Sequence, residues 1–328
     1  FAATGRTIKG TSADNDSKSI NITGAGATFP MPFYNQLIAD YSTKTDKLVT
    51  YGGIGSGGGI RSLKDKVVDF GATDAYLTDK QAAELPAPIV HIPTCLGAVV
   101  LAYNLPGVAT LKLKNEILVK IFMGEITKWN DNQIKAENPG VNFPDLNISV
   151  LYRSDGSGTT FIFSDYMSKI SEKWAKEIGT GKTLKWPVGM SAKGNPGVAG
   201  TIQQTIGAFG YIGSEYAFSA KIPFVKLQNK AGNFIEPSVA SVSAAAQGDI
   251  PADTRVMLTN SSDPKAYPIS AFTWIILYKE QNYNGRSLQQ AEETLKFLDW
   301  LIGSDAQAVA QKVDYAPLPD KAVTLAKK

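Results

Sequence analysis

The sequence contains one cysteine and one histidine among its 328 residues. A lone thiol, Cys95, excludes an internal disulfide, and one Cys with one His cannot build a cysteine-rich or histidine-rich metal site. Cys95 stands in the apolar run Thr94–Gly97, which favours a buried and unreactive thiol. We therefore expect no metal and no cofactor, and His91 is the only candidate for a histidine general base.

The chain also lacks a surplus of either charge and any long apolar run. Lys and Arg number 33 against 30 Asp and Glu, a net charge of +3, and no basic block stands out, so no nucleic-acid partner is expected. No apolar run approaches the roughly 20 residues that span a bilayer. The longest runs, 96–103 and 269–278, predict buried strands. Residues 1–19 are polar and rich in Gly, Ser, Asp and Lys, and we expect them to form a mobile leader outside the fold.

Short apolar strands alternate with helical periodicity along the rest of the chain, which is typical of α/β proteins with largely parallel sheets. We interpret Asn104–Gly107 and Tyr267-Pro268 as two crossings between lobes. This places residues 20–104 and 268–328 in lobe I and residues 105–267 in lobe II. The prediction is a two-lobed α/β fold, each lobe a mixed, mainly parallel sheet flanked by helices, with a ligand cleft between the lobes and a two-strand hinge.

Three turns rich in Gly, Ser and Thr stand at predicted helix starts: Gly26–Phe29, Gly55–Gly59 and Gly156–Thr160. Each turn offers backbone N–H donors and the positive end of a helix dipole to an anion. One such turn alone is a common loop sequence and does not indicate a ligand. Three of them, at the carboxyl ends of strands on two lobes, favour one shared anion site.

Two further residues refine this interpretation. Arg153, just before the third turn, carries a guanidinium fork that fits a tetrahedral oxyanion, and Asp155 could hold that fork in place. Asp74 follows a predicted strand and is not positioned as a helix cap. A carboxylate beside a bound anion needs an anion that has a proton to donate. Hydrogen phosphate has one, whereas sulfate at neutral pH does not.

Four motifs occur in order: Thr23–Pro30, Gly53–Ser56, Val68–Asp74 and Arg153–Thr159. With them the chain resembles the phosphate-binding proteins of bacterial high-affinity phosphate ABC transporters. The resemblance runs from about Asn21 to the C-terminal Asp314–Pro319, includes Met123–Asn130 and Gly207–Tyr211, and implies the two-lobed fold of periplasmic binding proteins.

The resemblance also implies the ligand residues. They are Thr28, Phe29, Ser56, Asp74, Arg153, Ser157, Gly158 and Thr159, with Asp155 in support. Thr28, Phe29, Ser56, Ser157, Gly158 and Thr159 would donate through backbone N–H groups, and Thr28, Ser56 and Ser157 also through their hydroxyls. Asp74 would accept the phosphate proton, and Arg153 would pair with the anion.

The implied function is high-affinity binding of inorganic phosphate and its delivery to the membrane permease of an ABC transporter. We expect a monomer in the periplasm or outside the cell, with or without a membrane anchor at a removed N-terminus, and no enzymatic activity. One alternative is a different oxyanion: arsenate, sulfate or molybdate. The other is a serine hydrolase using Ser56 or Ser157 with His91, although neither serine stands in a Gly-x-Ser-x-Gly motif.

Overall fold

The computed structural model describes residues 20–328, so the expected leader at 1–19 lies outside the described residues. One eight-stranded sheet runs through this part of the chain in the order β2-β1-β3-β11-β4-β8-β6-β7. The strands are β1 Asn21–Gly26, β2 Leu48–Gly53, β3 Phe70–Thr73, β4 Ile89–Tyr103, β6 Ser149–Arg153, β7 Met190–Ala192, β8 Ala208–Gly213 and β11 Ser270–Tyr278. A small sheet joins β10 Phe234–Ile235, β9 Lys226–Gln228 and β5 Lys112–Leu113.

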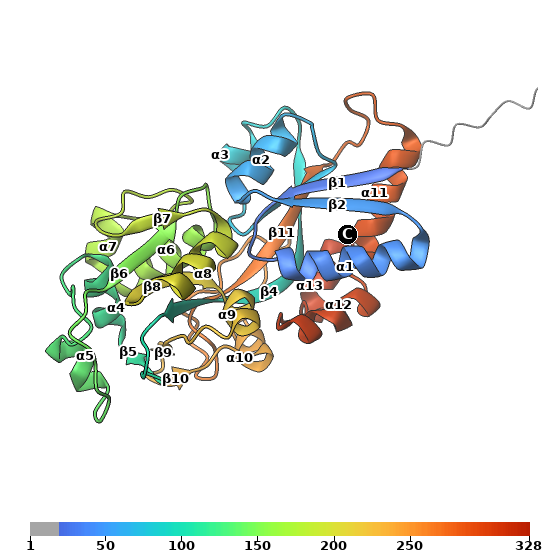
Figure 1. Ribbon diagram of the computed structural model, residues 1–328. Helices are drawn as coiled ribbons and strands as arrows, with labels where there is room; N and C mark the ends of the chain where they lie inside the picture. Colours follow the sequence, from blue (N-terminus) through green and yellow to red (C-terminus); the bar gives the residue numbers. More distant parts are fainter. Residues whose placement is uncertain (1–19) are drawn as a thin grey trace, which may run out of the picture.

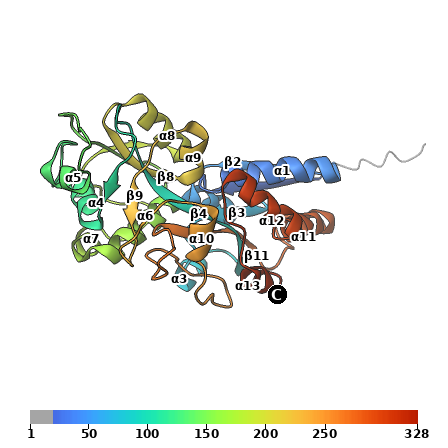
Figure 2. The ribbon, with the colours of Figure 1, turned by 90° about the horizontal axis from the view of Figure 1, so that it is seen from below.

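Two lobes share the large sheet (Figure 1). The first lobe contains β1, β2, β3 and β11 with helices α1 Met31–Thr45, α2 Ser56–Lys64, α3 Asp79–Ala82, α11 Leu288–Leu301, α12 Ser304–Ala310 and α13 Asp320–Ala326. The second lobe contains β6, β7 and β8 with α4 Asn115–Phe122, α5 Asn132–Glu137, α6 Gly158–Ile170, α7 Glu172–Glu177, α8 Gly194–Gln204, α9 Ser214–Ala220 and α10 Val239–Ala244. From below, α1, α11 and α12 lie at one end of the molecule, and α4, α5 and α7 lie at the other (Figure 2).

Strand β4 belongs to both lobes. Its residues 89–98 pair antiparallel with β11, and its residues 99–103 pair antiparallel with β8. The outer strands of each lobe are parallel: β1 with β2 and β3, and β6 with β7 and β8. This confirms the expected α/β class with mixed sheets. The sequence boundaries of the lobes, 104/105 and 267/268, stay a prediction.

Strand β4 begins earlier than the apolar run 96–103 indicates. The sequence pattern breaks at Pro93, which cannot donate to a sheet ladder. The structure accommodates Pro93 at an irregularity, where Thr273 pairs with Cys95 and the next residue, Trp274, pairs with Pro93. The extra residue, Thr94, bulges out of the ladder, so the strand continues back to Ile89.

Helix α2 also begins earlier than expected, at Ser56, inside the glycine-rich turn. Its first turn packs directly on the end of β1. A Cβ added at Gly59 would lie 2.6 Å from the Cα of Gly26 and 2.7 Å from the carbonyl oxygen of Ala25. The glycines therefore allow the helix start to approach the strand ends more closely than any other residue would.

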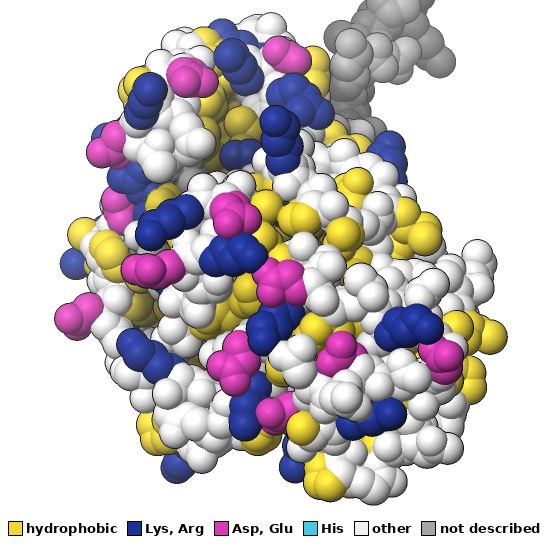
Figure 3. All heavy atoms as spheres, turned by 90° about the vertical axis from the view of Figure 1, so that its left-hand side faces the viewer, with side chains coloured by type: hydrophobic (Ala, Val, Ile, Leu, Met, Phe, Trp, Pro, Cys, Tyr) yellow, Lys and Arg dark blue, Asp and Glu magenta, His cyan; other side chains and the backbone are white. Residues whose placement is uncertain are grey.

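Charged side chains are distributed over the face of the second lobe seen in Figure 3, where Lys and Arg alternate with Asp and Glu. The second lobe also has exposed pairs of opposite charge, such as Lys128 with Asp145. No field of one sign covers this face.

Candidate anion-binding site

The expected site residues come together where strand ends of the two lobes face each other. The first lobe contributes the turn after β1 (Thr28, Phe29), the start of α2 (Ser56) and the residue after β3 (Asp74). The second lobe contributes the end of β6 and the start of α6. A backbone hydrogen bond of 2.9 Å from Gly57 N–H to the Gly156 carbonyl joins the two helix starts across the lobes.

Gly158, in the second lobe, packs closely against Ser56 and Asp74 of the first. A Cβ added there would lie 2.6 Å from the Cβ of Asp74 and would overlap the Ser56 hydroxyl and the Asp74 Oδ2. A backbone N–H at the start of α6 therefore lies beside both side chains. A residue with a side chain fits this position only if the lobes separate or the side chains of Ser56 and Asp74 both move.

The helix starts leave backbone donors unpaired, because the first N–H groups of a helix have no intrahelical partner. Gly158 and Thr159 are the first two residues of α6, whereas the next N–H, of Thr160, is capped by the Ser157 hydroxyl at 2.9 Å. Ser157 is an exception to the expected set, since its own N–H donates to the Lys182 carbonyl at 3.0 Å. Ser157 therefore offers its hydroxyl rather than its N–H.

Asp155 holds Arg153 through a bidentate ion pair. Nε donates to Oδ1 at 2.7 Å, and Nη2 donates to Oδ2 at 2.6 Å. The guanidinium is almost completely buried, with 1% of its side chain exposed. Burial by itself would raise the pKa of Asp155, but the hydrogen bond and charge of Arg153 outweigh it and lower the pKa. Nη1 is left pointing toward the Thr159 hydroxyl, 3.4 Å away.

Asp74 is the acceptor of the site. It is 1% exposed, and its Oδ1 accepts a hydrogen bond of 2.7 Å from the Thr273 hydroxyl on β11. Its Oδ2 is buried and has no hydrogen-bond partner within residues 20–328. Burial raises the pKa of Asp74 to about 7, against the opposing effects of Thr273, Arg153 and Ser56. A buried oxygen of this kind is costly unless a donor reaches it.

This carboxyl predicts a pH dependence of stability in buffers free of multivalent anions. The unfolded chain releases the Asp74 proton near the ordinary value of 3.8 and the folded chain near 7, so the folded state binds more protons between these values. The free energy of unfolding should then fall as the pH rises through this window. Each pKa unit corresponds to about 1.4 kcal/mol, which gives an expected total of a few kcal/mol.

Urea unfolding of the wild-type protein and of Asp74→Asn checks this expectation. The variant should be the more stable of the two at pH 8, and the difference should shrink toward pH 4.5. A difference that stays constant over this range would contradict it.

Asn195 is completely buried in the site but was not among the residues predicted from the sequence. It stands in Gly194-Asn195-Pro196, at the start of α8 and just after β7. This is a fourth strand-end turn of the same kind as the other three, and that similarity was the available signal. Tyr216 and Tyr315 were also missed, and their hydroxyls donate to the carbonyls of Thr28 and Phe29.

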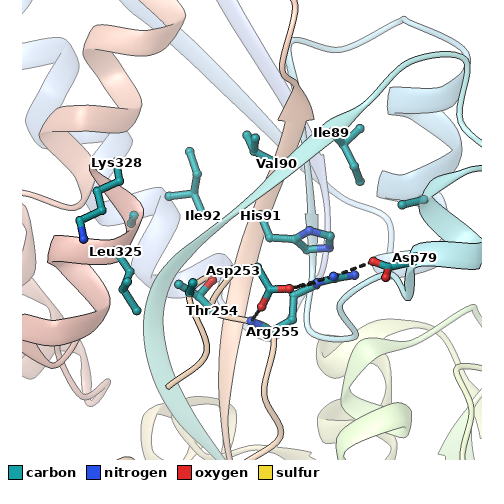
Figure 4. Close-up of a pocket in the computed structure, with 13 residues that line it drawn as sticks. Asp79, Ile89, Val90, His91, Ile92, Asp253, Thr254, Arg255, Leu325 and Lys328 are labelled. Carbon is teal, nitrogen blue, oxygen red and sulfur yellow. Dashed lines mark hydrogen bonds and ion pairs between the residues drawn. The ribbon is translucent and has the colours of Figure 1, made fainter. Parts of the chain in front are cut away.

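His91 lies in a different place, in a pocket of about 420 Å³ (Figure 4). Its Nε2 accepts the N–H of Leu77 at 3.0 Å. Burial, with the nearby charge of Arg255, lowers the pKa of His91 to about 4. The guanidinium of Arg255 crosses the pocket to Asp79 and Asp253. The structure thus pairs His91 with a backbone amide and not with a serine.

Within residues 20–328, no group of three or more His, Cys, Asp or Glu side chains is arranged to hold a metal ion. A search of the same residues finds no helix with the length and apolar character needed to cross a membrane.

Comparisons with known proteins agree with this architecture. A family model described as a PBP superfamily domain matches residues 3–305. The phosphate-binding protein PstS of Haemophilus influenzae is 40% identical over 314 residues, covering 94% of this chain and 91% of its own. PstS of Xylella fastidiosa is 38% identical over 312 residues, covering 94% and 84%. The chain therefore belongs to the PBP superfamily, and within it to the family of the phosphate-binding protein PstS.

Solved structures support the fold. A phosphate-bound periplasmic phosphate-binding protein, PfluDING, superposes with a TM-score of 0.74 at 21% identity, covering 93% of this chain and 92% of its own. A putative phosphate ABC transporter substrate-binding protein from Clostridium perfringens, also with bound phosphate, gives a TM-score of 0.67 at 17% identity, covering 91% and 100%.

Proposed function

We propose that this protein binds inorganic phosphate with high affinity in the site between its lobes and delivers it to the membrane permease of an ABC transporter. The observation that carries the proposal is the unpartnered, buried Oδ2 of Asp74 beside the donor-rich start of α6. Relatives that are 38–40% identical carry the name phosphate-binding protein, which supports the same ligand.

The ligand residues in this proposal are those that the resemblance implied. Thr28, Phe29, Gly158 and Thr159 donate through backbone N–H groups. Ser56 donates through its N–H and hydroxyl, Thr28 and Ser157 donate through their hydroxyls, and Arg153 supplies charge. Asp74 accepts the proton of the ligand, which discriminates against fully ionised oxyanions such as sulfate and molybdate. A site that depends on such a hydrogen bond can reject an analogue lacking the proton by about 10⁴-fold.

Phosphate would favour contact between the lobes because it bonds to both of them. In this proposal residues 20–104 and 268–328 move against residues 105–267, and the hinge lies in the two chain segments that cross between them. The protein works as a monomer in the periplasm or outside the cell, where the permease reopens it. It performs no hydrolysis, since His91 is bonded to Leu77 and neither Ser56 nor Ser157 has a histidine partner among the described residues.

Isothermal calorimetry with phosphate, arsenate and sulfate tests the ligand. Phosphate should bind tightly at pH 8, arsenate should also bind because it carries the same proton, and sulfate should give no measurable heat. Tight sulfate binding at this pH would overturn the role of Asp74.

A further inference from the structure

The side chain of Asn195 connects the two lobes at the site. Its Nδ2 donates to the hydroxyl oxygen of Thr28 at 2.9 Å and to that of Thr159 at 3.0 Å. Its backbone N–H donates to the same Thr28 oxygen at 3.1 Å. Thr28 belongs to the first lobe and Thr159 to the second, so this amide bonds to both.

The orientation of the Asn195 amide is determined by Gly213. The Gly213 N–H, which can only donate, lies 2.8 Å from Oδ1 of Asn195. The opposite amide orientation would place an NH₂ group against that N–H. The NH₂ group must therefore face the two threonines, and both of its hydrogens are used there.

This arrangement fixes the direction in which the two hydroxyls can bond. A hydroxyl has two lone pairs and one hydrogen. The Thr28 oxygen already accepts two hydrogen bonds, both from Asn195. The Thr159 oxygen accepts one from Asn195 and a longer one from Arg153 Nη1 at 3.4 Å. Neither hydroxyl donates to any acceptor in the part of the chain that the structure describes, so each has its hydrogen left to donate.

We propose that Asn195 is a positioning residue that makes the Thr28 and Thr159 hydroxyls obligatory donors to the bound oxyanion, and that it does so only when the lobes are in contact. The inference rests on the proposed phosphate function. It adds the Thr159 hydroxyl to the ligand donors and links lobe closure to donor orientation, because one side chain must reach both threonines.

The test replaces Asn195 with residues that reverse or remove its donors. In Asn195→Asp at pH 8, the introduced carboxylate accepts from both hydroxyls and turns their hydrogens away from the ligand. Phosphate binding, measured by calorimetry, should weaken about 100-fold relative to wild type. Asn195→Ala frees the hydroxyls without reversing them and should weaken binding by about tenfold.

A pH series separates this role from a purely structural one. At pH 5.5 the introduced carboxyl takes up a proton in the buried site and again presents a donor, so the ratio of wild-type to Asn195→Asp affinity should fall by about tenfold from its value at pH 8. The ratio of wild-type to Asn195→Ala affinity should be the same at both pH values, because alanine has no proton to gain.

The matched control is Asn229→Asp. Asn229 is also buried, and its Nδ2 donates to two oxygens, the carbonyls of Pro264 and Ala266, but it lies outside the site. The phosphate affinity of Asn229→Asp should be close to that of the wild-type protein at both pH values. Wild-type protein that fails to bind phosphate would refute the proposed function itself. If the wild-type protein binds phosphate, two results would refute the role of Asn195. One is that Asn195→Asp and Asn195→Ala bind phosphate with the same affinity as each other. The other is that Asn195→Asp loses the same factor in affinity at both pH values.

Discussion

Replacing Asp74 with Asn is expected to admit sulfate to the site. The wild-type carboxylate faces a fully ionised oxyanion with an unpaired, buried Oδ2, and both groups then lack a donor. An amide in the same place supplies N–H hydrogens instead. Sulfate affinity at pH 8 should rise by at least about 100-fold, the equivalent of one charge-assisted hydrogen bond made rather than lost. Phosphate should bind more weakly than to wild type, since its proton loses the carboxylate acceptor.

Calorimetry with both anions gives the ratio of phosphate affinity to sulfate affinity for each protein. Asp69→Asn is the control, because Asp69 is also buried but bonds to Arg286 and Thr23 away from the site; it should lower stability and leave the ratio unchanged. Wild-type protein should itself gain sulfate affinity below pH 7, as Asp74 becomes protonated. A ratio that is the same in wild type and Asp74→Asn would show that selectivity arises elsewhere.

Adding one methyl group at Gly158 is expected to abolish tight phosphate binding. The new Cβ in Gly158→Ala would overlap the Ser56 hydroxyl and Asp74 Oδ2, so the lobes must separate or both side chains must move. Overpacking of this kind costs about 1–3 kcal/mol, and the upper value corresponds to about a 100-fold loss of affinity. The cost is avoided when the lobes are apart, so the stability of each lobe should hardly change.

Gly200→Ala provides the control for the same substitution in a helix. A Cβ at Gly200, in α8, meets nothing within 4 Å. That variant should bind phosphate like wild type and should be slightly more stable, by about 0.5–1 kcal/mol, because alanine favours helix. Small-angle scattering should show that Gly158→Ala, unlike Gly200→Ala, fails to become more compact with phosphate. Wild-type affinity in Gly158→Ala would contradict the close approach of the lobes.

The parts of the fold that depend on local sequence patterns were predictable. Thr78 and Gln81 have the residue types and spacing of a capping box and form one at the start of α3, and the two longest apolar runs lie in β4 and β11. The extent of β4 was not predictable, because the bulge that accommodates Pro93 exists only through pairing with β11. The start of α2 at Ser56 was missed for a similar reason. Three successive glycines disfavour a helix locally, and packing against β1 outweighs that preference.

In the candidate site, too, contacts between neighbours in the sequence were predictable and contacts between distant residues were not. Arg153 and Asp155 stand two residues apart, so the sequence could suggest the ion pair that the structure shows. The partner of the Ser157 N–H, Lys182, lies 25 positions later and depends on the path of a loop. Asn195 was missed because an Asn before Pro at a helix start is ordinary turn chemistry. Its importance comes from two threonines that lie 167 and 36 positions away in the chain.

The ion pair between Arg153 and Asp155 also bears on competition in solution. Since the carboxylate of Asp155 pairs with the guanidinium, the positive charge of Arg153 is partly balanced and attracts small anions in general only weakly. Chloride, which outnumbers phosphate in most media, brings neither a proton for Asp74 nor four oxygens for the surrounding N–H and O–H groups. Abundance alone therefore gives chloride little occupancy of this pocket, and scarce phosphate can be captured without a high background of halide.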